Sequence, residues 1–132
     1  MAQPGEKPLN FVSSIPANGA TNVSRSIGTI TLVFDKNVVD DSVWEDNKTQ
    51  IDFWAGSDRL EKRIDYNVVR STATAKRRNI YIKPIGLLKA NTKYTIRIGP
   101  KLTSKAGQSL GKSVIITFTT GRRGVVPTPI EE

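Results

Sequence analysis

The sequence predicts an all-β fold, a seven-stranded antiparallel β-sandwich, and two observations support this class. Apolar residues come in short runs separated by Gly, Pro, Asn and Ser, with turn signals about every 8–12 residues. The segment 87–99 also looks like a late sandwich strand, because Tyr94, Ile96 and Ile98 alternate with polar residues after the turn sequence Ala90-Asn91-Thr92. A tyrosine in this place predicts a tyrosine corner, with a buried ring and a hydroxyl group bonded to upstream backbone.

The length and composition limit the kinds of protein that this chain can be. With 132 residues it is long enough for one domain with its own core. It contains neither Cys nor His, which excludes disulfides and thiolate or imidazole zinc sites, and we expect no cofactor. No run of about 18 apolar residues predicts a membrane span, and the first residues lack the apolar centre of a signal peptide. Residues 1–8 and 122–132 contain Pro and are predicted to be linkers around a domain at residues 9–121.

The apolar pattern predicts each strand in turn. We expect strands at residues 10–16, 27–34, 51–54, 63–70, 79–84, 94–98 and 114–120. The period of two is clear in the second of these, where Ile30, Leu32 and Phe34 share one face. Phe34, Tyr94 and Phe118 are the aromatic residues that we expect to have a structural role in the core.

The connections between the strands carry their own signals. Pro16 ends the first strand or confines it to an edge, because it has no N–H group for a ladder. Asn18-Gly19 then supplies a turn with positive φ, and Val23 returns the chain to the core. Further on, Asp40 or Asp41 can cap a single helical turn.

Five motifs occur in one order between residues 11 and 120. They are VSSIPANGATNV at 12–23, ITLVFDKNV at 30–38, IYIKP at 80–84 leading to LKANTKYTI at 88–96, AGQSL at 106–110, and ITFTT at 116–120. With them the chain resembles the bacterial Ig-like domains of surface-layer and other large bacterial surface proteins. It departs from the family pattern at Ser104 and Gln108, where relatives commonly carry Asp before the Ala-Gly pair and Asn after it.

The resemblance implies an Ig-like or fibronectin-III-like sandwich that is one module of a larger secreted or surface-bound bacterial chain. Such modules act as spacers, presentation domains or adhesive domains, and their partners are the neighbouring domains of the same chain. The residues themselves point away from an enzyme. The carboxylate pairs Asp40-Asp41 and Glu45-Asp46 are adjacent in the chain, and adjacency does not place two carboxylates across a substrate.

The charge distribution supports an alternative function. The net charge is +8, nine of the twelve acids fall between Asp35 and Asp65, and thirteen bases follow before the next acid. The alternative is a module that binds an anionic glycan, a cell-wall polymer or nucleic acid through a basic surface. The purely structural interpretation is that these charges occupy solvent-exposed strand positions and bind no partner. The candidate binding residues are Arg77, Arg78, Lys93, Arg97 and Lys112.

Three further expectations follow from the same charges. Nucleic acid is the weakest of the ligands, because no RRM, KH or helix-turn-helix signature is present. Neighbouring copies could attract end to end, through the acidic middle and the basic later part of the chain. Asp35, Asp40 and Asp41 could share a calcium ion, although their spacing matches no loop with a defined ligand order.

Trp54 is the candidate for stacking on a sugar ring. Ile51 and Phe53 share one face of the predicted strand, so Trp54 points away from them, together with Asp52. Two interpretations stay open. Either the indole ring packs in the core or at a sheet edge, or it is partly exposed and available to a glycan.

Overall fold

The computed structural model describes residues 9–56 and 65–121, so the predicted linkers at 1–8 and 122–132 lie outside the described residues. The described part contains eight strands and one α-helix. The strands are β1 (Phe11–Ile15), β2 (Ala20–Val23), β3 (Ile30–Phe34), β4 (Ile51–Ala55), β5 (Tyr66–Val69), β6 (Asn79–Pro84), β7 (Lys93–Ile98) and β8 (Val114–Thr120). The helix is α1 (Asp41–Asn47), and short 3-10 turns follow at Lys48–Gln50 and Thr74–Lys76. No described helix is long and apolar enough to cross a membrane.

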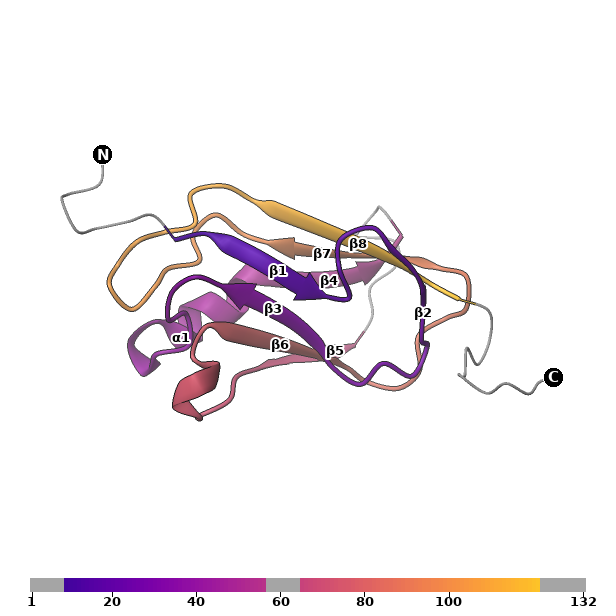
Figure 1. The fold of residues 1–132 in the computed structure, drawn as a ribbon, viewed down its shortest axis with the longest axis horizontal. Helices are drawn as coiled ribbons and strands as arrows, with labels where there is room; N and C mark the ends of the chain where they lie inside the picture. Colours follow the sequence, from indigo (N-terminus) through magenta and orange to yellow (C-terminus); the bar gives the residue numbers. More distant parts are fainter. Residues whose placement is uncertain (1–8, 57–64, 122–132) are drawn as a thin grey trace.

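The strands form two sheets that pack face to face, which confirms the predicted β-sandwich (Figure 1). The first sheet has the order β1-β3-β6-β5, and the second has the order β2-β8-β7-β4. Every pair of strands is antiparallel except β2 and β8, which run parallel. The arrangement therefore differs from the predicted one in two details: the described strands number eight, and the second sheet is mixed.

The additional strand arises where the chain changes sheets. β1 ends at Ile15, because the next residue, Pro16, has no N–H group to continue the ladder with β3. The turn that follows carries Gly19 at a φ of 85° and directs the chain to the second sheet. There Gly19 N–H donates to Thr117 O at 2.7 Å, and Gly121 N–H donates to Val23 O at 3.0 Å. Val23 does return to the core, as predicted, but as part of a strand that pairs with β8.

The core lies between the two sheets and has an aromatic centre. Phe53, Tyr94 and Phe118 come from three neighbouring strands of the second sheet and are each at most 2% exposed. The centroid of the Tyr94 ring lies 5.6 Å from that of Phe53 and 5.6 Å from that of Phe118. Phe34, at 1% exposure, packs from the first sheet with its ring edge-on to Phe11. Burial of this area is the main source of stability for a domain without disulfides.

The chain enters the described domain at one end and leaves it at the other. Leu9 and Phe11 lie at the end that carries α1, because Phe11 pairs with Phe34 just before the helix segment. Gly121 follows the last residue of β8, at the opposite end of the long axis (Figure 1). The α1 end also holds the connections between β5 and β6 and between β7 and β8 (Figure 1).

Candidate functional site

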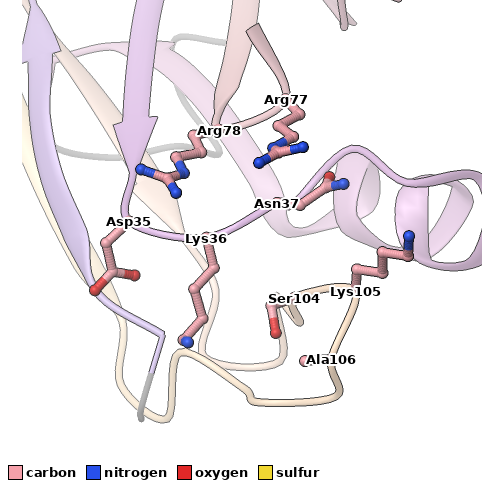
Figure 2. Close-up of a pocket in the computed structure, with 8 residues that line it drawn as sticks. All are labelled: Asp35, Lys36, Asn37, Arg77, Arg78, Ser104, Lys105 and Ala106. Carbon is pink, nitrogen blue, oxygen red and sulfur yellow. The ribbon is translucent and has the colours of Figure 1, made fainter. Parts of the chain in front are cut away.

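The α1 end of the sandwich contains a hollow of about 470 Å³, which we call the basic hollow. Three connections surround it: the 35–40 segment after β3, the 70–78 segment before β6, and the 99–113 segment between β7 and β8. Its lining residues are Asp35, Lys36, Asn37, Arg77, Arg78, Ser104, Lys105 and Ala106 (Figure 2). Residues far apart in the sequence therefore meet at one place because the connections at this end converge.

Backbone hydrogen bonds hold these segments in place. Phe34 N–H donates to Arg78 O at 2.8 Å and Val38 N–H donates to Arg77 O at 3.1 Å, so the pairing of β3 with β6 continues past both strands. Lys105 N–H donates to Asn37 O at 2.8 Å and ties the third segment to the first. The basic hollow is consequently formed by the fold itself, before any ligand is present.

Ser104 and Gln108 brace the third segment. Ser104 is 1% exposed, and its hydroxyl group lies 3.0 Å from Gln108 Oε1. The Gln108 N–H donates back to Ser104 Oγ at 3.2 Å, and Ser104 N–H donates to Gln108 O at 2.8 Å. Ser104 and Gln108 thus close this loop by polar contacts to each other.

The charges of the basic hollow are predominantly positive. Lys36, Arg77, Arg78 and Lys105 contribute cations, and Asp35 is the single acid among the lining residues. Both carboxylate oxygens of Asp35 are engaged, since Oδ1 accepts from Asn10 N–H at 2.9 Å and Oδ2 accepts from the Asn10 side chain at 3.1 Å. The hollow is therefore suited to an anion.

Two acidic residues beside the basic hollow, Asp40 and Asp41, form ion pairs with basic residues of the domain. Asp41 contacts Arg70 Nη1 at 2.8 Å, and Asp40 lies 3.9 Å from Lys105 Nζ. The Arg70 guanidinium also donates to Val39 O at 2.6 Å and lies 5.6 Å from the centroid of the Trp44 ring. The acidic and basic parts of the chain thus meet at one end of the domain, which gives no support to the expected end-to-end attraction between copies.

Asp40 has a structural role as the N-cap of α1. Its Oδ2 accepts from Ser42 N–H at 3.1 Å and from Ser42 Oγ at 2.6 Å. These two bonds to Ser42, the side-chain bond first, lower the pKa of Asp40 below its ordinary value, with smaller help from the charges of Lys105 and Arg70. Within residues 9–56 and 65–121, Asp35, Asp40 and Asp41 do not form a group that could hold a metal ion.

The five predicted polyanion-binding residues do not form one surface. Arg77 and Arg78 lie side by side at the basic hollow. Arg97 instead lies on the outer face of the second sheet, where it pairs with Asp52 at 3.8 Å and donates to Ser113 Oγ at 3.2 Å. Lys93 opens β7 at the opposite end of the sandwich, and Lys112 precedes β8 outside the hollow.

Sequence reasoning missed Lys36 and Lys105 as partners of the two arginines. The signal for Lys36 was the polar interruption Asp35-Lys36-Asn37 directly after an apolar strand. Lys105 sits in the long 99–113 segment, and no local pattern shows that this segment turns back to contact Asn37.

Trp54, the candidate for sugar stacking, lies in β4. Its side chain is buried at 7% exposure, on the face of β4 that points away from the core cluster. A pyranose ring needs an accessible indole face, so this burial favours core or edge packing, and stacking of Trp54 on a glycan stays an untested prediction. Phe34, Tyr94 and Phe118 all lie in the core cluster, where the sequence analysis put them.

Comparison with known proteins places the chain in a family and a fold. The profile of the bacterial Ig-like domain family matches residues 5–120. No curated protein sequence matches the chain. Domains 1–6 of the surface-layer protein SbsC are similar in structure, with a TM-score of 0.58 and 14% identity over 87% of this chain. The match spans only 14% of that SbsC chain, so the similar part there is one piece of a much longer protein.

Other similar structures come from proteins of different kinds. The methionine-rich copper resistance protein PcoC from Escherichia coli matches with a TM-score of 0.60 and 13% identity, over 86% of this chain and 99% of its own. An L,D-transpeptidase from Mycobacterium smegmatis matches with a TM-score of 0.53 and 17% identity, over 87% of this chain and 41% of its own. At such identities these similarities show the shared fold alone.

Proposed function

Since the chain belongs to the bacterial Ig-like domain family, we propose that it is a non-catalytic module that spaces and presents other domains of a larger bacterial surface or secreted protein. The observation that carries this proposal is that the described chain enters the sandwich before β1 at the α1 end and leaves it after β8 at the opposite end (Figure 1). A domain with this geometry separates whatever precedes it from whatever follows it by its own long axis. The match to a short part of the long surface-layer chain SbsC supports the same proposal.

The pairing of the terminal strands suits a module that is held between neighbours. β2 and β8 run parallel, so a pull on the two ends of the chain slides one strand along the other. Their contacts are loaded together: Gly19 N–H to Thr117 O at 2.7 Å, Gly121 N–H to Val23 O at 3.0 Å, and Thr117 N–H to Asn18 Oδ1 at 2.9 Å. β1 is likewise paired lengthwise with β3. Hydrogen bonds that share a load resist it better than bonds that open one at a time.

The composition supports a role without catalysis. The chain has no His or Cys, and the basic hollow contains a single carboxylate, which is already bonded to Asn10. A general acid and base pair needs two titratable groups on either side of a reacting bond. The lining of the hollow has no second carboxylate to face Asp35, and its other charged residues are lysines and arginines.

Single-molecule pulling tests the proposal. In one geometry the handles are attached at the two chain ends. In the other, the N-terminal handle is moved to an engineered Lys89→Cys, which is unique because the chain has no native Cys. The second geometry peels β8 from β7, since both strands are then pulled from the same end. We expect a clearly higher unfolding force in the end-to-end geometry, and equal forces in the two geometries would contradict a load-bearing spacer.

A further inference from the structure

We infer that the basic hollow binds a phosphate group, either free or as a phosphodiester of an anionic polymer. This inference goes beyond the proposed spacer role and does not rest on it. It starts from Arg77 and Arg78, whose guanidinium groups both point toward the segment that carries Lys36 and Asn37 (Figure 2).

The two arginines differ from the other arginines that the structure describes. Arg25 donates to Leu88 O at 2.8 Å, Arg70 pairs with Asp41, and Arg97 pairs with Asp52. Among the described residues, neither Arg77 nor Arg78 has a side-chain hydrogen bond or an ion pair. Both are exposed and adjacent in the chain, so two guanidinium groups with free donors stand at the rim of one hollow.

Their positions are fixed although their side chains are free. The backbone carbonyls of Arg78 and Arg77 accept from Phe34 and Val38, which anchors both Cα atoms to the end of β3. Asn37 is also oriented, because its Oδ1 accepts from Val39 N–H at 3.0 Å. This leaves the NH₂ group of Asn37 as another donor beside the arginines. A site built in advance loses less entropy on binding than one that must be ordered.

The number of charges favours phosphate over a single carboxylate. Lys36, Arg77 and Arg78 carry three positive charges without an ion-pair partner among the described residues, and Asp35 offsets at most one of them. Free phosphate, like a phosphate monoester, carries roughly −1.5 to −2 at neutral pH, whereas a carboxylate carries only one negative charge. A phosphodiester also carries one negative charge, but an anionic polymer carries several such groups in succession. The planar guanidinium fork also matches two phosphate oxygens at once.

The residue types that line the hollow argue against nucleic acid as the preferred source of the phosphate. None of the lining residues is aromatic, so a base has no ring to stack on. Tyr81, the aromatic residue nearest in sequence, lies on β6, and its hydroxyl group accepts from the Asn79 side chain at 3.1 Å. The volume of about 470 Å³ lies within the range of roughly 300–1,000 Å³ typical of small-ligand sites.

Titration of the whole 132-residue chain, followed by amide chemical shifts, tests the inference. The probes are sodium phosphate and a poly(glycerol phosphate) oligomer, with sodium acetate and an oligothymidylate for comparison, all at equal ionic strength. We expect both phosphate probes to saturate and to shift the amides of Lys36, Asn37, Arg77, Arg78 and Lys105 most. Equal shifts of these amides by acetate, or tighter binding of the oligothymidylate than of the glycerol polymer, would overturn it.

Matched charge variants separate a site from general attraction. R77Q/R78Q removes the two free guanidinium groups and should weaken phosphate binding by about tenfold or more. The control K83Q/K89Q removes the same charge from exposed residues outside the hollow and should weaken binding by less than about twofold. R77K/R78K keeps the charge without the fork and should fall between the two. Equal weakening by R77Q/R78Q and K83Q/K89Q would overturn the site.

Discussion

The hydroxyl group of Tyr94 accepts a hydrogen bond of 2.7 Å from the backbone N–H of Lys89, five residues upstream. The ring of Tyr94 is 1% exposed and packs between Phe53 and Phe118, so its position is fixed by the core. Asn91 lies between the two bonded residues with a φ of 50°, in the left-handed region that Asn tolerates. The bond therefore fastens a tight turn to the core just before β7 begins.

Removal of this hydroxyl group should lower stability without changing the fold. Tyr94→Phe keeps the ring and loses the bond to Lys89, and we expect it to lower the free energy of unfolding by about 1 kcal/mol. Urea denaturation of both proteins measures the difference. Tyr81→Phe is the matched control, because among the described residues the Tyr81 hydroxyl group accepts from the side chain of Asn79 and not from backbone. An equal or greater loss in Tyr81→Phe would contradict the tyrosine corner.

Asn47 should be among the most sensitive polar residues of the domain. It is 1% exposed, and its NH₂ group donates to Val38 O and to Thr103 O, each at 2.8 Å. Its Oδ1 accepts from Thr103 N–H at 2.9 Å, so one side chain joins α1 to two connections. Asn47→Ala would leave these backbone groups unpaired, and we expect a loss of about 3 kcal/mol in the free energy of unfolding.

The control for Asn47 is Asn67, an exposed residue of β5. Asn67→Ala should change the free energy of unfolding by no more than about 0.5 kcal/mol. A loss in Asn47→Ala as small as that in Asn67→Ala would show that the α1 end is not braced through this side chain.

The Asp40 cap predicts a pH dependence with a definite sign. Its pKa is lowered in the folded protein, chiefly by the side-chain and backbone bonds from Ser42, so its contribution to stability is present above the ordinary value of 3.8. That contribution is lost as the pH falls through the lowered pKa. The free energies of unfolding of the native protein and of the Asp40→Asn variant should differ by a constant amount near neutral pH. This difference should shrink below about pH 4.

Ser42→Ala tests the cause of the lowered pKa. Without the Ser42 hydroxyl group, the strongest bond to Asp40 is missing, and the pKa of Asp40 should rise toward its ordinary value. NMR titration of the Asp40 carboxyl group measures the pKa directly. An unchanged pKa in Ser42→Ala would mean that the backbone bond from Ser42 and the nearby charges, and not the hydroxyl bond, set its value.

Trp54 should affect stability and not glycan binding. Because the side chain is 7% exposed, Trp54→Ala should lower the free energy of unfolding by about 3 kcal/mol or more. Fluorescence of a Trp44→Phe variant, which leaves Trp54 as the single indole, should show weak quenching by acrylamide and no change with soluble glycans. Strong quenching would show that the ring is accessible after all.

The sequence pattern was sufficient to predict the bounds of strands in which apolar and polar residues alternate regularly. β6 and β8 begin and end where the alternation of apolar and polar residues predicts, and β7 begins one residue earlier than expected. The cap of α1 was also predictable, since Asp40 precedes the helix with Ser42 in bonding distance. The parallel pairing of β2 with β8 was not, because the four residues Ala20–Val23 have only half-buried or exposed side chains and no periodic pattern.

The sequence predicted only some of the residues of the basic hollow, because contacts between distant segments decide which basic residues lie there. Arg77 and Arg78 stand out as a basic run in the sequence, but Arg97 and Lys112 stand out equally. Arg97 differs from the first two by its pairing with Asp52, a cross-strand neighbour that follows from register and not from composition, and Lys112 differs by its position outside the hollow. Local charge thus identifies candidate residues, and tertiary structure decides which of them are free.

Small-angle scattering of a protein with three tandem copies, joined by residues 122–132 and 1–8, tests the spacer role most directly. A spacer predicts a radius of gyration well above the roughly 21 Å of a compact chain of that length, against about 14 Å for one copy. The value should stay constant between about 0.1 M and about 1 M salt, as the Debye length falls from about 10 Å to about 3 Å. A compact particle near 21 Å would contradict the account, because the copies would then pack against one another instead of extending the chain.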